Sequence, residues 1–384
     1  MSFPRGQCAI VGAATFGMGE SPGFTALELA SRASVLALKQ AGLTPAQVDG
    51  VFGCMTSSNF CGLSLAEYLG IAPKLTNNNK IGGSSFQTHV LWATLALSAG
   101  LIDVALIAYG SNLRSGAVNL SGNMQAQSSP YEAPYEALRP VSAYAMAAAR
   151  HMHEYGTTRE QLAHVAVSAR QWAQRNPDAF MRDPLSVQDV LASRRVSDPL
   201  TVRDCCLMTD GAGAIVLTRA DRARDLCATP VHVLGAAEAM GHKDISSSTN
   251  LTTTAAAQSG ARAYAQAGVG AADVDVVQLY DAFTINTLLF LEDLGFCPKG
   301  EGGRFVADGH IAPGGSLPVN TNGGGLSCVH PGMYGMFTLI EASQQLMGLA
   351  GARQVPGAQL ALAHGNGIEL SSQATVILGT AATL

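Results

Sequence analysis

The chain repeats part of itself, and this internal repeat limits its possible folds more than any other feature of the sequence. The stretch AGLTPAQVDGVFGC at 41–54 aligns without a gap with AGVGAADVDVVQLY at 267–280. A second pair follows in the same order, because an expected helix leads into an expected strand at 84–110 and again at 331–367. Two ordered correspondences indicate an internal duplication. The alternative is a pair of unrelated α/β segments that share turn chemistry.

Strand and helix signals alternate within each half of the chain. Nearly continuous apolar runs predict strands covered by helices on both faces: VALIAY (104–109), AIVLT (214–218), VDVVQLY (274–280) and QLALA (359–363). This alternation predicts right-handed crossovers and a mostly parallel sheet in each half. We therefore expect an α/β fold of two duplicated halves, 1–229 and 230–384. The first half includes an insertion at about 115–200 that covers one end of the sheets, where α/β proteins usually bind ligands.

Local sequence signals mark the starts of two helices. Thr25 with Glu28, and Ser84 with Gln87, have the spacing of capping boxes. Gly42 predicts the end of the first of these helices.

Composition narrows the class of protein. The chain has 384 residues, of which 47% are hydrophobic and 13% are charged, so it can bury a large core. A net charge of −5 argues against nucleic acid as a partner. The sequence offers neither a signal peptide nor a membrane-spanning segment, which predicts a cytoplasmic protein. Its 8 cysteines lack metal-binding spacing and favour neither a disulfide framework nor a zinc site.

Four segments are expected to meet where the two halves join. Three are glycine-rich turns and the fourth is a strand end: KIGGSSF (80–86), NTNGGGLSCVHPGMYG (320–335), AHGNGIELSS (363–372) and QLYDAFTIN (278–286). Taken singly, each has a structural explanation, since such a loop is more often a turn than a site. His330 could be a core histidine, and Tyr280 could be a packing residue.

The duplication relates these residues to one another. Tyr280 occupies the same strand end as Cys54 in the repeat. His330 and Tyr334 stand at the start of the duplicate of the helix that Gly83 opens. This convergence favours a shared ligand site at the junction.

Together these motifs resemble the thiolase superfamily, in its branch of sterol-carrier-protein-x-type thiolases and thiolase-like lipid-transfer proteins. The resemblance covers essentially the whole chain and rests on NTNGGGLSCVHPG (320–332), DPLTVRDCCLMTDGAGAIVL (198–217) and DAFT (281–284). It implies a five-layered αβαβα fold, usually a dimer, in which a coenzyme A thioester enters as substrate under the insertion. It implies no tightly bound cofactor and no metal.

The sequence departs from the thiolase pattern at both expected cysteines. The nucleophilic cysteine of thiolases corresponds to Gly83, and no cysteine lies near the HGNG turn at 364–367. Acyl transfer needs a thiolate to carry the acyl group. A retro-aldol cleavage needs none, because a base takes the proton of a β-hydroxyl and the thioester enolate is protonated. The missing side chain at Gly83 is expected to clear space for a bulky substrate and to leave helix N-terminal N–H groups facing it.

The resemblance to thiolase-like steroid side-chain retro-aldolases assigns Tyr280 and Tyr334 to proton transfer. His330 is assigned to bind the thioester oxygen or to shuttle the proton. A free tyrosine has a pKa of about 10, so the acid role is the easier one, and which tyrosine acts as acid stays open. The expected substrate-binding residues are Gly83, Ser84, Asp281, Asn286, Cys328, His364, Gly365 and Asn366.

Two other functions remain open at this stage. The chain could be a true thiolase acting on a 3-ketoacyl-CoA with a displaced cysteine, Cys328 or Cys54, or a non-catalytic acyl-CoA-binding subunit. We expect a homodimer, or a heterotetramer with a small accessory protein of zinc-ribbon and OB-like fold. Local candidates for the coenzyme A phosphates are Arg139, Arg150, Arg194 and Arg195.

Overall fold

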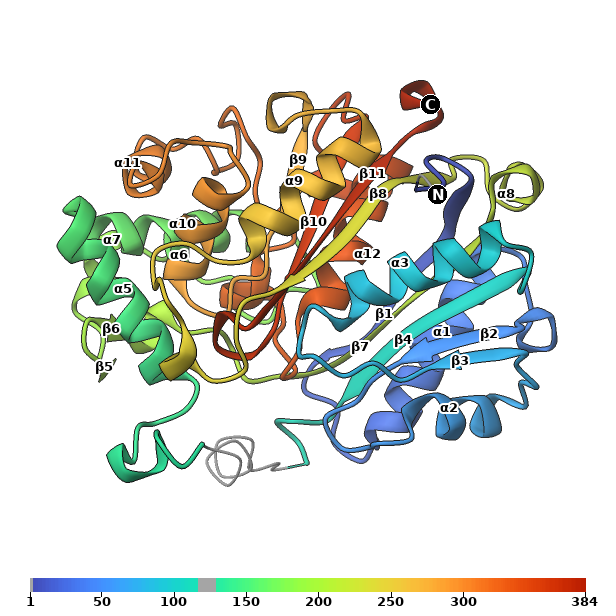
Figure 1. Cartoon of the computed structure of the whole chain (residues 1–384), viewed down its shortest axis with the longest axis horizontal. Helices are drawn as coiled ribbons and strands as arrows, with labels where there is room; N and C mark the ends of the chain where they lie inside the picture. The colour runs from blue at the N-terminus through green and yellow to red at the C-terminus, as the bar shows by residue number, and fades with distance from the viewer. Residues whose placement is uncertain (1–2, 117–128) are drawn as a thin grey trace.

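One nine-stranded sheet runs through both halves of the chain (Figure 1). The structure is a computed structural model that describes residues 3–116 and 129–384. The first half contributes β1 (Cys8–Gly19), α1 (Ala26–Gln40), β2 (Gly50–Gly53), α2 (Cys61–Leu69), β3 (Leu75–Asn77), α3 (Ser85–Ser98), β4 (Val104–Ser111), β7 (Asp210–Arg219) and α8 (Ala220–Leu226). The second half contributes β8 (Val231–Met240), α9 (Ala256–Ala267), β9 (Val276–Gln278), α10 (Thr284–Asp293), α11 (Gly302–Ala307), α12 (Gly335–Met347), β10 (Leu360–Asn366) and β11 (Ser372–Gly379).

The two halves repeat the same strand order. The sheet runs β3-β2-β4-β7-β1-β8-β11-β10-β9, and the two halves meet where β1 pairs with β8. Beyond β9, Val319 bridges Val277 in parallel, as β3 borders β2 in the first half. We propose that the two structural units divide between α8 and β8, at residues 229 and 230.

The strands are less uniformly parallel than the sequence suggests. β4, β2 and β3 are parallel, but β7 is antiparallel to both β4 and β1. In the second half β9 and β10 are parallel, whereas β11 is antiparallel to β10 and β8. The prediction of a mostly parallel sheet was therefore wrong. The short turn between β10 and β11 leaves no room for the crossover that parallel neighbours require.

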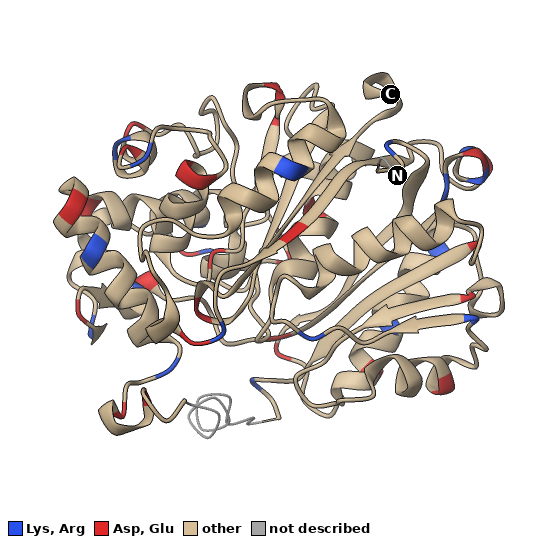
Figure 2. Ribbon diagram, in the orientation of Figure 1, with Lys and Arg blue, Asp and Glu red and all other residues tan. Residues whose placement is uncertain are grey.

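Helices α3 and α12 form the central layer of five. Each packs on strands of both halves and on the other, whereas α1 and α2 cover the far side of the first half and α9 and α10 that of the second (Figure 1). Almost every residue of α12 is buried, as expected of a helix enclosed on all sides. Figure 2 shows that Lys, Arg, Asp and Glu lie mainly on the outer helices and loops. The predicted five-layered αβαβα fold is confirmed.

The insertion forms a helical layer beside the second half. It contains α5 (Val141–Tyr155), α6 (Arg159–Ala173), α7 (Val187–Leu191) and a short hairpin of β5 (Arg195–Ser197) and β6 (Leu200–Thr201). Helices α5 and α6 pack on α10, α6 also packs on α11, and α7 packs on α6, at the left of Figure 1. Residues 117–128 of the predicted insertion lie outside the described part of the chain. None of the helices that the described residues form has the length and apolar character to cross a bilayer.

Of the two predicted capping boxes, one is present. Thr25 and Glu28 cap α1 reciprocally, and Gly42 follows the helix with a φ of 65°. At α3 the prediction was wrong, because Ser84 makes no capping bond. Its Oγ lies 2.7 Å from Ser372 Oγ, while Gln87 Nε2 donates to the carbonyl oxygen of Gly335 at 2.9 Å. Both side chains form hydrogen bonds with segments that are distant in the sequence.

The starts of helices α3 and α12 meet at a pair of glycines, Gly83 and Gly335. A Cβ added to Gly335 would lie 1.9 Å from the carbonyl oxygen of Gly83. Because that oxygen belongs to the backbone, it cannot swing away as a flexible side chain would. The first turn of α12 therefore requires glycine for its packing.

We predict that Gly335→Ala destabilises the protein by about 1–3 kcal/mol or more, because the added methyl overpacks a rigid contact. Urea unfolding followed by circular dichroism measures this change. Gly241→Ala is the matched control, because its added Cβ meets only one atom within 4 Å, at 3.9 Å. Equal stability of both variants would contradict the predicted contact.

Candidate active site

Tyr280 is fixed by the loop that follows the second half's edge strand. Its neighbour Leu279 donates its N–H to Asn320 Oδ1 at 2.7 Å, and Asn320 adopts a φ of 52°. One residue earlier, Gln278 Nε2 donates to Thr321 Oγ1 at 2.9 Å. The strand end and the NTNGGG motif thus position each other, and the Tyr280 side chain lies buried between the two central helices.

His330 lies beside the Tyr280 hydroxyl. Its Nε2 is 3.1 Å from the Tyr280 oxygen, and its own backbone N–H donates to Thr209 Oγ1 at 3.0 Å. Burial lowers the pKa of His330 to about 4. The imidazole is therefore neutral near pH 7, with one ring nitrogen able to accept a proton.

Tyr334 completes a cluster of three rings. It is the N-cap residue of α12, and its hydroxyl donates to Asn322 Oδ1 at 2.9 Å. The ring centroids of Tyr280 and Tyr334 are 5.9 Å apart at 81°, and those of His330 and Tyr334 are 6.3 Å apart at 17°. The structure therefore brings together the three residues that the sequence nominates for proton transfer.

Both phenols are held in the protonated form. Burial raises the pKa of Tyr280 and of Tyr334 well above the ordinary value, and the negative charge of Asp281 adds to the effect at Tyr334. A hydrogen bond from the Tyr334 backbone partly opposes the shift at Tyr280. A raised pKa means that each hydroxyl keeps its proton at neutral pH and acts first as a donor.

The side chain of Asp281 requires a glycine at position 324, within the glycine run after Asn322. Its Oδ1 accepts the N–H of Gly325 at 2.6 Å and its Oδ2 that of Leu326 at 3.4 Å, within a π-helical turn at Gly324–Cys328. Gly324 has a φ of 65°, and a Cβ there would lie 2.0 Å from the Asp281 carboxylate. Burial raises the pKa of Asp281 to about 7, although these N–H groups lower it.

Gly83 lies directly against the ring of Tyr280. A Cβ at Gly83 would lie 2.0 Å from Cε2 and 2.7 Å from Cζ of that tyrosine. The expectation that the missing side chain clears space for a bulky substrate was therefore wrong. The phenol ring itself fills the volume that a side chain at Gly83 would occupy.

Three further expected residues lie around Gly83. Ser84 follows it in the chain, and Gly365 and Asn366 lie close to these two residues. Gly365 faces α3, since a Cβ there would lie 2.1 Å from Gln87 Oε1 and 2.8 Å from the Cα of Ser84. The carbonyl oxygen of Asn366 would lie 2.9 Å from a Cβ at Gly83. The Asn366 side chain donates to the hydroxyl of Tyr144 at 2.9 Å.

Two other expected residues, His364 and Asn286, lie at α10. His364 alternates with Gly365 along β10 and faces α10, where its ring stacks edge-on with Phe290 at 4.6 Å. Its ring nitrogens bond Thr375 and Gln373, each at 2.9 Å. Asn286 is buried within α10 and its amide has no partner among the described residues.

Cys328 and Cys54 are poor nucleophiles in this structure. Both are buried, and burial raises the pKa of Cys54 to about 12 and that of Cys328 further. Cys328 Sγ accepts a long hydrogen bond from Asn176 Nδ2 at 3.5 Å. Lys80 lowers the pKa of Cys54 and Arg353 lowers that of Cys328, but in each case burial has the larger effect.

Sequence reasoning missed several groups that organise the site. Asn322 Oδ1 accepts the hydrogen bond of the Tyr334 hydroxyl, and Asn322 lies within the NTNGGG motif, so the sequence carried a signal for it. The hydroxyl oxygen of Thr209 accepts the backbone N–H of His330, and Thr209 lies in the segment 198–217 that carries the resemblance to thiolases. Tyr144 is a further buried phenol, and its ring centroid lies 4.3 Å from that of Phe283, on which it stacks. It comes from the insertion, where no sequence pattern marked it as a site residue. No group of three or more His, Cys, Asp or Glu side chains among residues 3–116 and 129–384 could hold a metal ion.

Comparison with known proteins agrees with this geometry. Residues 237–380 match the thiolase C-terminal domain-like family. The chain is 36% identical over 359 residues to 17-hydroxy-3-oxo-4-pregnene-20-carboxyl-CoA lyase of Mycobacterium tuberculosis, covering 89% of this chain and 92% of the lyase. It is 33% identical over 367 residues to an acetyl-CoA acetyltransferase of Methanothermobacter thermautotrophicus, covering 94% and 96%.

A solved structure extends the comparison to three dimensions. The Ltp2-ChsH2(DUF35) aldolase superimposes with a TM-score of 0.90 at 32% identity, covering 98% of both chains. These relatives include an acetyltransferase, a lyase and an aldolase. The comparisons therefore establish the fold, and the side chains of the site distinguish between acyl transfer and carbon-carbon cleavage. The chain belongs to the thiolase superfamily, in its sterol-carrier-protein-x-type, thiolase-like branch near the steroid side-chain aldolases.

Proposed function

We propose that this protein is a thiolase-like retro-aldolase that cleaves a β-hydroxyacyl-CoA to a ketone or aldehyde and a shortened acyl-CoA. One observation carries the proposal: the Tyr280 phenol occupies the volume beside Gly83 where the thiolase pattern calls for a nucleophilic side chain. A hydroxyl that can exchange a proton thus replaces a sulfur that could carry an acyl group. The lyase and aldolase names of two similar proteins support the same reaction.

The alternative, acyl transfer through a displaced cysteine, is not favoured. Transfer requires a thiolate that attacks the acyl carbon and later releases it. Cys54 and Cys328 are buried, and their raised pKa values leave almost no thiolate near pH 7. The retro-aldol reaction avoids this requirement.

We assign the removal of the β-hydroxyl proton to Tyr280 together with His330. As the substrate proton moves to the Tyr280 oxygen, the phenol proton moves to His330 Nε2, 3.1 Å away. The freed electron pair forms the carbonyl of the leaving ketone or aldehyde, and the electrons of the Cα–Cβ bond move into the thioester enolate. Because burial opposes a charged His330, the imidazolium is short-lived and passes its proton on.

We assign protonation of the enolate carbon to Tyr334. Its hydroxyl is neutral at working pH, since burial and the charge of Asp281 raise its pKa. The proton that His330 gained then restores Tyr334 before the next turnover, so no net proton is consumed. We further propose that N–H groups at the start of α3, at Gly83 and Ser84, receive the thioester oxygen of the enolate.

The substrate class and assembly follow from the same likeness. We propose a bulky, steroid-type β-hydroxyacyl-CoA, because the lyase from M. tuberculosis acts on a steroid-derived coenzyme A ester by its name. We propose a homodimer, or a heterotetramer with a small zinc-ribbon and OB-fold accessory protein. The DUF35 component named in the similar aldolase supports such a partner. We also propose a cytoplasmic location and no nucleic-acid partner, as a net charge of −5 suggests.

The purified protein, with and without its accessory protein, should convert a tertiary β-hydroxyacyl-CoA to a ketone and a shortened acyl-CoA. Chromatography with mass detection should find both products without added free CoA. Cys54→Ser and Cys328→Ser should retain this activity within a few-fold. A strict need for free CoA, or a covalent acyl-enzyme, would instead establish thiolysis.

Tyr280→Phe should lower kcat by about 10²–10⁴-fold, because it removes the group that accepts the substrate proton. Tyr264→Phe is the matched control: this tyrosine donates to the carbonyl oxygen of Leu294 at 3.1 Å, away from the candidate site. Initial rates, with circular dichroism to verify folding, measure the effect. Unchanged kcat in folded Tyr280→Phe would rule out the assigned role.

Gly83→Ala should destabilise the wild type by about 1–3 kcal/mol, because its methyl meets the Tyr280 ring. In a Tyr280→Ala background the same change should cost much less, since the ring is gone. Urea unfolding of the four proteins gives the coupling free energy without any activity assay. Additive costs would show that Tyr280 does not fill this volume.

A further inference from the structure

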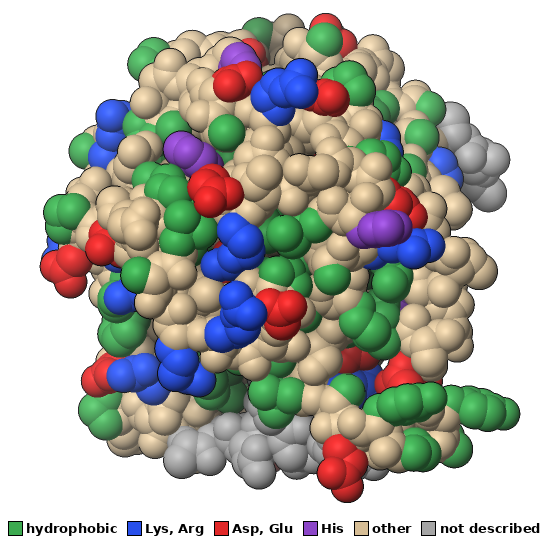
Figure 3. Space-filling model, turned by 90° about the vertical axis from the view of Figure 1, so that its left-hand side faces the viewer, with side chains coloured by type: hydrophobic (Ala, Val, Ile, Leu, Met, Phe, Trp, Pro, Cys, Tyr) green, Lys and Arg blue, Asp and Glu red, His purple; other side chains and the backbone are tan. Residues whose placement is uncertain are grey.

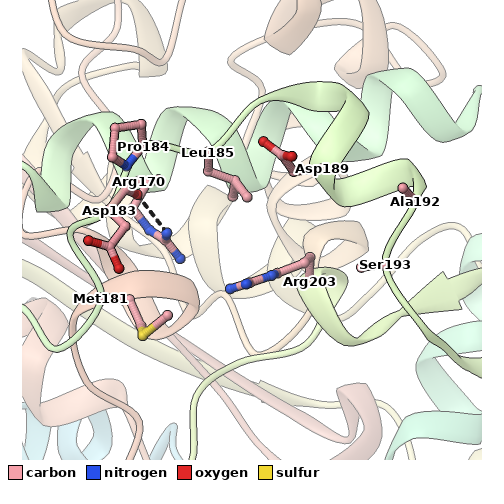
Figure 4. Close-up of a pocket in the computed structure, with 9 residues that line it drawn as sticks. All are labelled: Arg170, Met181, Asp183, Pro184, Leu185, Asp189, Ala192, Ser193 and Arg203. Carbon is pink, nitrogen blue, oxygen red and sulfur yellow. Dashed lines mark hydrogen bonds between the residues drawn. The ribbon is translucent and has the colours of Figure 1, made fainter.

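A pocket of about 390 Å³ opens on the insertion, and charges of both signs line it (Figure 4). Arg170 and Arg203 lie there with two carboxylates, Asp183 and Asp189. Arg170 is already engaged, since it donates to Ser327 Oγ at 3.0 Å and to the carbonyl oxygen of Asp183 at 2.8 Å. On the face that Figure 3 shows, Lys and Arg are likewise interspersed with Asp and Glu. These balanced charges single out no ligand, and the insertion contributes a more specific group in its interior.

Tyr144 comes from α5 and is buried beside the candidate active site. It is 2% exposed, and its ring stacks on that of Phe283, with the centroids 4.3 Å apart. Phe283 follows Tyr280 closely in the chain, within the segment QLYDAFTIN. After burial, the neighbouring Tyr144 is the largest cause of the raised pKa of Tyr280. The two phenols are therefore near enough for each to affect the charge of the other.

The oxygen of Tyr144 is surrounded by N–H donors. Asn366 Nδ2 donates to it at 2.9 Å, and the backbone N–H groups of Glu369 and Leu370 also form hydrogen bonds with it. Burial raises the pKa of Tyr144, and the negative charge of Glu369 adds to the effect, whereas these donors oppose it. The raised pKa means that the hydroxyl keeps its proton at neutral pH.

The turn that supplies the two backbone donors has an unusual conformation. Glu369 and Leu370 adopt φ values of 54° and 63°, in the left-handed region that side chains other than glycine rarely enter. Arg139 holds this turn from the insertion, because it binds both carboxylate oxygens of Glu369, at 2.6 and 2.7 Å. Strained backbone of this kind persists where surrounding contacts determine it, and it is concentrated at functional sites. The turn thus directs consecutive N–H groups at one phenol oxygen.

The proton of Tyr144 has no acceptor within residues 3–116 and 129–384. A hydroxyl can donate one hydrogen bond and accept two, and buried polar groups are usually paired. Because N–H donors already surround the oxygen, the O–H bond points away from Asn366 and from the turn at Glu369 and Leu370. The one hydrogen-bonding capacity that Tyr144 leaves unused is therefore a donor.

Asn286 adds a second buried polar group without a partner on the same side of the fold. Residues three and four apart share one face of a helix, so Asn286 lies on the face of α10 between Phe283 and Phe290. Phe283 touches Tyr144, and Phe290 touches His364. Neither Nδ2 nor Oδ1 of Asn286 has a partner in the part of the chain that the structure describes. Both unpaired groups indicate that a ligand with polar atoms binds here.

We infer that Tyr144 is a third phenol of the candidate active site and that its hydroxyl donates a hydrogen bond to an oxygen of the bound acyl thioester. The inference rests on the proposed function, which supplies such a substrate. The β-oxygen gains negative charge as its proton leaves, and the thioester oxygen gains it in the enolate. A fixed donor in a buried site stabilises charge that develops on an oxygen. Tyr144 would therefore lower the barrier without exchanging its own proton.

Tyr144→Phe should lower kcat/KM by about 10²–10³-fold, because a donor to the charged oxygen is lost while a ring remains to stack on Phe283. Tyr264→Phe is the matched control, since its hydroxyl donates to the carbonyl oxygen of Leu294. Initial rates, with circular dichroism to verify folding, measure the effect. An unchanged kcat/KM in folded Tyr144→Phe would overturn the inference and leave the proposed function intact.

Tyr144→Phe also removes the acceptor of Asn366 Nδ2, so a second variant separates the two roles of the hydroxyl. Incorporation of 3-fluorotyrosine in place of Tyr144 makes the hydroxyl a stronger donor and a weaker acceptor. If the hydroxyl donates to the substrate, kcat/KM should equal or exceed that of the wild type. A loss as large as that of Tyr144→Phe would show that Tyr144 acts only by holding Asn366.

Fluorine NMR of the same fluorinated protein provides a readout that needs no enzymatic activity. Two unreactive ligands are compared, a coenzyme A thioester without the β-hydroxyl and a thioether that keeps the β-hydroxyl but lacks the thioester oxygen. We expect the fluorine resonance to shift with the ligand whose oxygen receives the hydrogen bond, and to stay in place with coenzyme A alone. A shift in a protein without lyase activity would support the role of Tyr144 and refute the retro-aldolase proposal. No shift with either ligand, when calorimetry shows that both bind, would overturn the inference.

Discussion

The contact between Gly83 and its surroundings is the constraint on which the rest of the structure depends. Its carbonyl oxygen touches the first turn of α12 at Gly335, and its α-carbon faces the ring of Tyr280. The two halves of the fold can meet this closely only because both glycines lack side chains. The same closeness places the start of each central helix at the junction, so the packing of the core and the position of the candidate site have a single origin.

Burial then determines the chemistry that the junction can perform. It lowers the pKa of His330, raises that of Asp281 and raises those of both phenols, so each group is pushed toward its neutral form. A site of neutral donors and acceptors favours proton exchange between neighbours over storage of a stable charge. The thiols nearby are affected in the same direction, which removes thiolate chemistry while leaving proton transfer possible.

The sequence predicted what local and repeated patterns determine. The capping box at Thr25 and the apolar strands follow from neighbours in the chain, and the duplication placed Tyr280, His330 and Tyr334 at one junction. The prediction from sequence failed where the hydrogen-bond partner is distant in the chain, because Ser84 bonds Ser372 instead of capping its helix. Likewise, no pattern around Gly83 could reveal that a ring from the other half fills the adjacent volume. His364 shows a third limit, because strand alternation assigns its face only once the register of β10 is known.

The π-helical turn at Gly324–Cys328 connects the insertion with the candidate active site. On its inner side, Gly325 and Leu326 hold Asp281 next to Tyr280, and on its outer side Ser327 meets Arg170. Such a turn is costly to form and persists where surrounding contacts determine it. Since both sides are bound to buried charged groups, a shift of Arg170 cannot be absorbed within the turn without disturbing Asp281. The packing of the insertion and the placement of the phenols are thus linked through five residues.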